Sequence, residues 1–140
     1  MRLVLDTNTA LSGLLWDGPP ARLIEAAEAG KIDLVTSVAL LTELRDVLSR
    51  EKFSRPLTLR KLDRQGVFAY YLALVNIAAP AVISPTVTAD RTDDAVLAAA
   101  VGGGVDLIVS GDAHLLNLKS FQGIDIVIAA TAVGRVNPGA

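Results

Sequence analysis

Arg2-Leu3-Val4-Leu5-Asp6-Thr7-Asn8 is a short apolar run that ends in an acid and two polar residues. The run has the length of a buried strand, and the leucines that follow it recur at helical spacing. We therefore predict a strand that passes directly into a helix. Asp6 stands at the junction, where it can cap the helix and also face the crevice that forms at the carboxyl ends of parallel strands.

The same alternation of short apolar runs and helical segments continues along the chain. Thr36 or Ser37 is placed to cap a helix after a second strand, and Pro19 or Pro20 is placed to open the helix before it. Strands are predicted at residues 2–5, 32–36, 106–109 and 124–128, with a short one inside 76–83; helices begin near residues 7, 19, 37, 58, 93 and 112, and a helical turn ends the chain. This order predicts an α/β fold, a three-layer α/β/α sandwich around a mostly parallel sheet.

Composition narrows the class of protein and of metal site. The 140 residues suit a single domain over residues 1–140, and half of them are apolar, but no apolar run approaches the roughly 20 residues that span a bilayer. We therefore expect a soluble, cytoplasmic protein with no membrane segment. The chain has no Cys and a single His114, so a metal site would use oxygen ligands rather than the nitrogen and sulfur ligands of zinc sites.

Four acids are candidates for one common site. Asp6, Asp94 and Asp112 stand where helices begin, and Glu43 borders the apolar stripe of a helix. Taken one at a time, each has an ordinary explanation as a helix cap or a surface group. Gathered at one edge of a sheet, however, four carboxylates would repel one another unless a cation neutralised them. The pattern therefore predicts a site for Mg²⁺ or Mn²⁺, the ions that assist phosphoryl chemistry.

The third acid of this set is ambiguous, because Asp90, Asp93 and Asp94 lie close together. Asp94 directly precedes an Ala-x-Leu-Ala helical pattern, and Asp93 is kept as the alternative.

Basic residues are concentrated between Arg45 and Arg64, which hold seven of the thirteen in the chain. The stretch is either a solvated surface or a basic rim beside the acids, and Arg45, Arg50, Lys52 and Arg60 are its candidate residues for contacts with nucleic-acid phosphates. The predicted helix from Thr58 to Val75 carries more apolar residues than one core-facing stripe needs. That excess predicts a homodimer or partner contact, or else burial between two layers.

The acidic motifs resemble those of PIN domains. The matching segments are Asp6-Thr7-Asn8, Glu43, the run from Asp94 to Ala100, and Ser110-Gly111-Asp112. Further segments, Gly18 to Leu23 and Leu41 to Leu44, are similar to the VapC-like toxins of prokaryotic toxin–antitoxin systems. The resemblance implies a metal-dependent endoribonuclease, commonly dimeric and often inhibited by a cognate antitoxin protein.

The resemblance also implies a role for each matching residue. Asp6, Glu43, Asp94 and Asp112 would hold Mg²⁺ or Mn²⁺. Asn8 and Ser110 would orient the carboxylates or a metal-bound water, with Asp93 beside them. Local turn and cap hydrogen bonds are an equally good explanation of Asn8 and Ser110.

Two other functions remain open on the sequence. An Asp after the first strand followed by Thr also begins the motif of haloacid-dehalogenase-like phosphatases, but the second acid of that motif is replaced by Asn8, and Lys119 is the only lysine past residue 61. The other alternative is a PIN-like module that binds RNA or protein without cutting. Metal-dependent cleavage of RNA would separate these alternatives.

Overall fold

The computed structural model describes residues 1–86 and 91–137 and contains one six-stranded sheet. The strand order is β3-β2-β1-β4-β6-β5, with every neighbouring pair parallel except β5 and β6. The strands are β1 (Arg2–Leu5), β2 (Asp33–Thr36), β3 (Asn76–Ile77), β4 (Leu107–Val109), β5 (Ser120–Phe121) and β6 (Ile124–Val127). The predicted mostly parallel sheet is confirmed.

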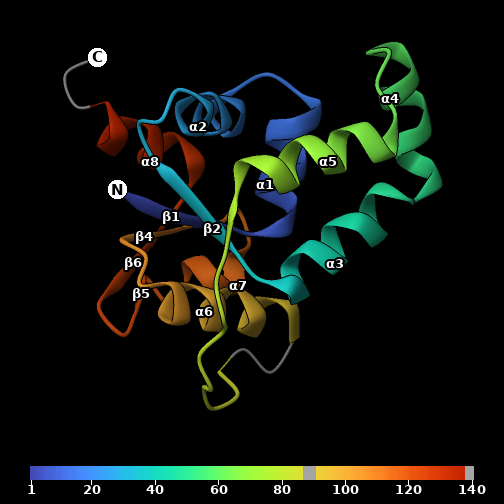
Figure 1. The fold of residues 1–140 in the computed structure, drawn as a ribbon. Helices are drawn as coiled ribbons and strands as arrows, with labels where there is room; N and C mark the ends of the chain where they lie inside the picture. Colours follow the sequence, from blue (N-terminus) through green and yellow to red (C-terminus); the bar gives the residue numbers. More distant parts are fainter. Residues whose placement is uncertain (87–90, 138–140) are drawn as a thin grey trace.

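Helices cover both faces of this sheet, as Figure 1 shows, with α1, α2, α5 and α8 on one side and α6 and α7 on the other. The helices are α1 (Thr7–Leu15), α2 (Pro19–Glu28), α3 (Val38–Leu48), α4 (Ser54–Leu59), α5 (Arg64–Leu74), α6 (Arg91–Gly103), α7 (Ala113–Leu116) and α8 (Ala129–Val136), with a 3-10 turn at Glu51–Phe53. The α/β/α sandwich predicted from the sequence is therefore confirmed.

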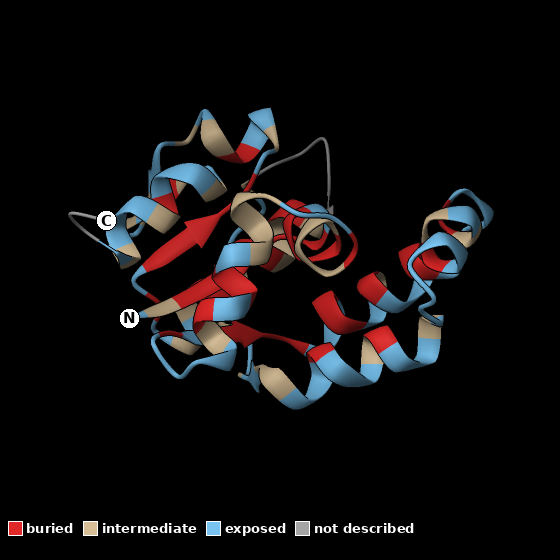
Figure 2. Cartoon of the chain, turned by 90° about the horizontal axis from the view of Figure 1, so that it is seen from above, coloured by how far each residue is buried: buried red, intermediate tan, exposed pale blue. Residues whose placement is uncertain are grey.

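Side-chain alternation along the strands divides the core into two layers. On β1, Leu3 and Leu5 pack into the layer of α1, α2 and α5, whereas Val4 packs against α6. On β4, Ile108 likewise points toward α6 while its neighbours point the other way. Figure 2 shows the central strands almost wholly buried. Both faces are apolar because both are covered, as expected of a parallel sheet.

The prediction of a long helix capped by Thr58 is wrong. Thr58 lies inside α4, where its hydroxyl donates to the Ser54 carbonyl 2.8 Å away. The chain then turns at Lys61, whose φ is 56°, and Asp63 caps a separate helix, α5, by accepting from the Gly66 amide at 2.6 Å. Asp63 is a better cap than Thr58, because its carboxylate reaches the third amide beyond it. The segment from α3 through α4 to α5 extends away from the sheet (Figure 2).

Of the two edge strands of the sheet, β3 lies within the predicted segment 76–83, whereas β5 was not expected. The third strand is only Asn76–Ile77, because Pro80 and the segment around it turn onto α6, where the Ala81 amide donates to the Ala98 carbonyl at 2.9 Å. The strand β5 was not predicted; it pairs antiparallel with β6 through a turn at Gln122 and Gly123, both with positive φ.

Within residues 1–86 and 91–137, no helix has the length and apolarity needed to cross a membrane.

Gly102 explains how this segment can lie so close to α6. A Cβ at Gly102 would lie 2.1 Å from the Ala79 carbonyl oxygen and 2.7 Å from the Ala81 nitrogen, and both are backbone atoms. We expect Gly102→Ala to lower the free energy of unfolding by roughly 1–3 kcal/mol, the usual cost of overpacking. Urea unfolding followed by circular dichroism measures this.

Gly134 is the matched control for that substitution, because it is also helical and has open space around its Cβ position. Gly134→Ala should leave stability unchanged or raise it by up to about 1 kcal/mol, since alanine favours the helix. Equal unfolding midpoints for the two variants would contradict the close approach of residues 79–81 to α6.

Candidate active site

Asp6 and Ser110 form the centre of the candidate site, although 104 residues separate them in the sequence. Asp6 caps α1 by accepting from the Thr9 amide at 2.8 Å, and its second oxygen accepts from the Ser110 hydroxyl at 2.5 Å. Ser110 Oγ in turn accepts from the Asp112 amide at 2.9 Å. Asp6 is 6% exposed and Ser110 1% exposed. The cap interpretation of Asp6 is thus correct but incomplete, because a long-range contact also holds the carboxylate.

The strand geometry explains why these two side chains meet. β1 and β4 are parallel neighbours, with Leu5 opposite Val109, so the residues that follow them emerge side by side at the carboxyl edge of the sheet. The Asp6 amide also donates to the Val109 carbonyl at 3.0 Å. A hydroxyl and a carboxylate placed at this register are brought together by the sheet rather than by any local motif.

Asp112 follows at the same edge as the cap of α7, where its carboxylate accepts from the His114 amide at 2.7 Å. It is partly exposed, and its side chain lines a cavity of about 300 Å³ together with Asn8, Thr9 and Ser110. Asn8 is exposed at this cavity. The sequence prediction that Asp6, Asn8, Ser110 and Asp112 lie near one another therefore agrees with the structure.

The structure also shows that Asp93 and Asp94 have different environments. Asp93 is 4% exposed and lies on the stripe of α6 that includes Val96, Leu97 and Ala100, which pack against the sheet. Asp94 lies about 100° further round the helix, is partly exposed, and accepts from the Thr86 amide at 3.2 and 3.3 Å. Burial and helix face thus favour Asp93, not Asp94, as the acid directed toward the sheet. Asp90 lies outside the described residues.

The first turn of α6 lies at the same edge as Asp6. Because α6 ends at Gly103, just before β4 begins, it runs back across the sheet and its N-terminal turn reaches the carboxyl ends of the strands. Val4 and Ile108 face α6, so the alternation of the strands sends Asp6 and Ser110 toward the same layer. By its helix, its burial and its face, Asp93 therefore lies with Asp6, Ser110 and Asp112 at the carboxyl edge of the sheet, which we call the acidic edge.

Glu43 approaches this edge from α3. It follows by three residues Leu40, which packs in the core layer of α6 with Val96 and Leu97, and it is partly buried. One turn of helix separates Glu43 from that contact. Its position at the border of the apolar stripe is as predicted from the sequence.

A buried tyrosine on α5 is part of this neighbourhood and was not predicted. Tyr71 is 2% exposed, and burial raises the pKa of its hydroxyl well above the ordinary range, with the negative charge of Asp6 raising it further. Tyr71 therefore stays protonated near Asp6. The sequence indicates only an apolar helix at this position, because nothing local to Tyr71 shows which strand end it faces.

The donor set fits the chemistry of the divalent ion that the acids imply. Carboxylates and hydroxyls are the oxygen ligands that Mg²⁺ and Mn²⁺ prefer, and Asp6, buried beside a hydroxyl, retains lone pairs beyond its two hydrogen bonds. The buried Thr7 hydroxyl, next to Asp6, has no hydrogen-bond partner within the described part of the chain. In these same residues, no three Asp, Glu or His side chains are close enough together to surround an ion. The residue types therefore suit a metal, while the ligand arrangement stays a prediction.

Most of the basic side chains between Arg45 and Arg64 are exposed on the surface. Arg45, Arg50, Lys52 and Arg60 are all exposed. Arg64 has a structural role instead, since its guanidinium donates to the Leu48 carbonyl and the Ser54 hydroxyl, both at 2.6 Å, and so ties α5 to the end of α3. The four candidate residues thus remain accessible to a partner in solution.

A comparison with known proteins identifies the family of this chain. A family model described as PIN domain matches residues 2–114, well over half of the chain. The chain belongs to the PIN-domain family. PIN domains are typically nucleases, and those nucleases generally use divalent metals. No curated protein matches the chain.

The PIN match covers every acid of the candidate site and ends at α7. Strand β6 lies beyond the match, yet it pairs with β4 and completes the sheet next to the site. The PIN assignment leaves the phosphatase interpretation without support. Asn8 stands where that motif requires an acid, and Lys119 lies exposed in a turn with a φ of 62°.

Proposed function

We propose that this PIN domain is a divalent-metal-dependent endoribonuclease that hydrolyses phosphodiester bonds in single-stranded RNA. The observation that carries the proposal is the buried Asp6 carboxylate held by Ser110 at the carboxyl edge of the sheet. A helix cap alone requires neither the burial of Asp6 nor the hydrogen bond from the Ser110 hydroxyl, 104 residues away. Single-stranded RNA is the favoured substrate because its phosphates can reach a recessed acidic edge that an A-form duplex would not enter.

We assign a role to each polar residue of the site. Asp6, Asp93, Asp112 and Glu43 would hold the ion, with Asp93 taking the place that the sequence pattern assigned to Asp94. When bound, the ion lowers the pKa of a coordinated water and neutralises charge on the phosphate. Ser110 holds Asp6 in one orientation, and Asn8, exposed at the cavity, is placed to donate its amide to a phosphate oxygen.

The proposal is tested by incubating purified protein with single-stranded and hairpin RNAs in Mn²⁺, in Mg²⁺ and in chelator. Cleavage that requires the metal and prefers single strands is the expected result. RNA that is bound but never cut in either metal would overturn the nuclease assignment and favour a PIN module without catalytic activity.

Ser110→Ala tests the role of the hydroxyl. The substitution removes the donor to Asp6 and the acceptor for the Asp112 amide, so the carboxylate loses its fixed orientation. Loss of such an outer partner typically lowers metal affinity or activity by roughly 10–100-fold. Mn²⁺ titration and initial cleavage rates measure both effects. Ser110→Thr restores the hydroxyl and should recover part of the activity. Unchanged Mn²⁺ affinity in Ser110→Ala would show that the hydrogen bond serves only the fold.

The exposed basic residues are proposed to contact RNA phosphates. Arg50→Gln and Lys52→Gln should each weaken RNA binding and flatten the plot of log K against log salt by about 0.7 for every phosphate whose cationic partner is removed. Lys31→Gln, exposed in the turn after α2, is the matched control. Equal salt dependence in all three variants would place the RNA elsewhere.

We further propose that the protein is the toxin of a type II toxin–antitoxin pair. The support is the similarity of its motifs to toxins of that kind. Induced expression should arrest growth of a bacterial host, and the Asp6→Asn variant should not. Growth that is unaffected by active nuclease would remove the toxin assignment and leave the nuclease assignment intact.

A further inference from the structure

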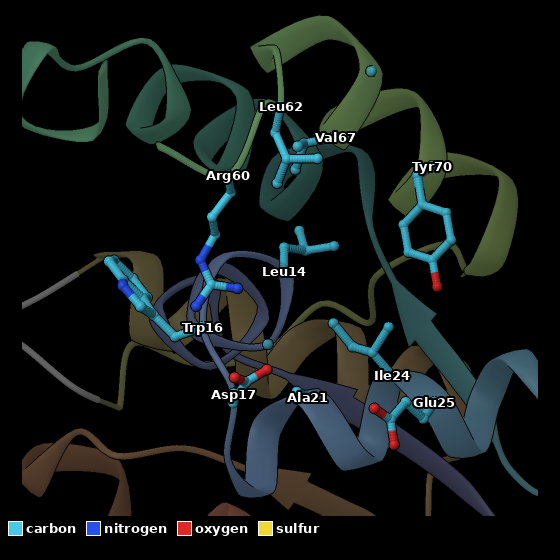
Figure 3. A pocket seen from close by; sticks show the side chains of 12 residues that line it. Leu14, Trp16, Asp17, Ala21, Ile24, Glu25, Arg60, Leu62, Val67 and Tyr70 are labelled. Atoms are coloured by element: carbon cyan, nitrogen blue, oxygen red, sulfur yellow. The ribbon is translucent and has the colours of Figure 1, made fainter. Parts of the chain in front are cut away.

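A second and larger cavity lies apart from the acidic edge. It has a volume of about 460 Å³, within the range of ligand pockets, and it lies between the C-terminal end of α1, α2 and the segment from α4 to α5. Figure 3 shows an apolar floor formed by Leu14 and Ile24 with polar and aromatic side chains around it. An apolar floor with a few polar groups at the rim is the usual form of a site for a planar organic ligand.

Trp16 gives this rim an aromatic surface. Its ring centroid is 6.2 Å from that of Phe53, at an angle of 57°, and Phe53 is itself buried. Trp16 nevertheless stays 40% exposed. The ring is therefore held in place on one side and still open to a ligand. Exposed aromatic side chains beside basic ones are the surfaces on which single-stranded bases stack.

The charged side chains around the pocket have different neighbours. The guanidinium of Arg60 points toward Asp17 and lies next to Trp16 in Figure 3. Glu25 lies across the floor from them, beside Tyr70. The Tyr70 hydroxyl donates to Glu28, and burial together with that hydrogen bond raises its pKa to about 12, so it remains protonated and carries no negative charge. Among the side chains labelled in Figure 3, Glu25 is thus an acceptor that faces no cation.

A carboxylate acceptor discriminates among the RNA bases. An ionised carboxylate can only accept hydrogen bonds. Guanine presents two adjacent donors, N1–H and the N2 amino group, on its Watson–Crick edge. Adenine and cytosine place a ring acceptor beside their amino group, and uracil places a carbonyl on each side of its single donor. A carboxylate opposite any of these three would be repelled by the neighbouring acceptor.

The pocket also lies within reach of the acidic edge. Helix α1 begins directly after Asp6 and ends at Leu15, next to Trp16, so its nine residues span about 14 Å. A few nucleotides of single strand cover that distance. RNA bound at the acids can therefore place a neighbouring base in the pocket.

We infer that the pocket between α1, α2 and α5 binds a guanine base of single-stranded RNA, stacked against Trp16 with its Watson–Crick edge toward Glu25. The inference rests on the proposed ribonuclease function, for which it supplies a base preference near the cleavage point.

The test uses the four nucleoside 5′-monophosphates in chelator, so that neither metal nor cleavage is needed. Trp16 is the single tryptophan of the chain, and its fluorescence therefore reports on this pocket alone. GMP should quench it saturably and bind roughly tenfold more tightly than AMP, CMP or UMP, the discrimination expected of one bidentate contact. Glu25→Gln should remove the preference, whereas Asp46→Asn, an exposed acid on α3 that does not line the pocket, should keep it. Calorimetry on the same samples checks the affinities.

Several outcomes would overturn the inference. These are equal affinity for all four nucleotides, an unchanged preference in Glu25→Gln, and quenching by argininamide but not by GMP. The last would mean that the pocket takes a cationic side chain of a partner protein. Because the assay contains no metal, failure of RNA cleavage leaves these binding results intact, and failure of GMP binding leaves the nuclease assay intact.

Discussion

Asp6→Asn should reduce RNA cleavage by at least about 100-fold while leaving the fold unchanged. Loss of an outer-sphere partner of a metal ligand costs roughly 10–100-fold, and loss of a ligand charge at the centre of the site should cost more. The fold should survive because Asn is as good a helix cap as Asp, so its side-chain oxygen can still accept from the Thr9 amide. Initial rates in Mn²⁺, together with thermal unfolding followed by circular dichroism, measure both expectations.

The matched control is Asp63→Asn, which replaces the capping acid of α5 by the same chemistry far from the acidic edge. Both variants keep a cap, so a difference in activity between them reports on the site and not on helix stability. If Asp6→Asn cuts RNA at the wild-type rate with the same metal requirement, the proposed site is wrong.

A second large effect distinguishes the two acids at the start of α6. Asp93→Asn should also lower cleavage by about 100-fold or more, because Asp93 is buried on the stripe that faces the sheet. Asp94→Asn should stay within a few-fold of wild type, because its carboxylate lies off that stripe and already accepts from the Thr86 amide. Single-turnover rates and Mn²⁺ titrations of the two variants under the same conditions make the comparison.

The two variants control each other, since each removes one charge from the same helical turn. The reverse result, with Asp94→Asn inactive and Asp93→Asn active, would restore the assignment that the sequence pattern favours. Equal and full activity in both would remove α6 from the site.

The order of strands and helices is predictable because it depends on local patterns. Period and length identify β1, β2 and β4, and the caps Asp6 and Ser37 mark the starts of α1 and α3. The break between α4 and α5 is not predictable in this way, because two candidate caps, Thr58 and Asp63, lie five residues apart. Choosing between them depends on Arg64, which bonds to the end of α3, and no local pattern contains that contact.

The candidate site is predictable in the same limited way. Acids that follow strands converge by topology, so the order of residues alone is enough to group Asp6, Ser110 and Asp112. The choice between Asp93 and Asp94 cannot be made from order alone, because it depends on which face of α6 meets the sheet. The proximity of Tyr71 to Asp6 cannot be predicted in this way, because Tyr71 packs in the other core layer and only the fold brings it close enough for the charge of Asp6 to raise its pKa. Sequence order identifies the edge of the sheet, and packing identifies the side chains that occupy it.

The pairing of Asp6 with Ser110 also constrains when during synthesis the site can form. Synthesis proceeds from the N-terminus, so the strand that precedes Ser110 leaves the ribosome about a hundred residues after Asp6. The contact requires β4 to insert beside β1, a long-range step that precedes any complete acidic edge. A nascent or truncated chain that ends before residue 110 therefore lacks the arrangement, so the proposed RNA cleavage can begin only after Ser110 has been made.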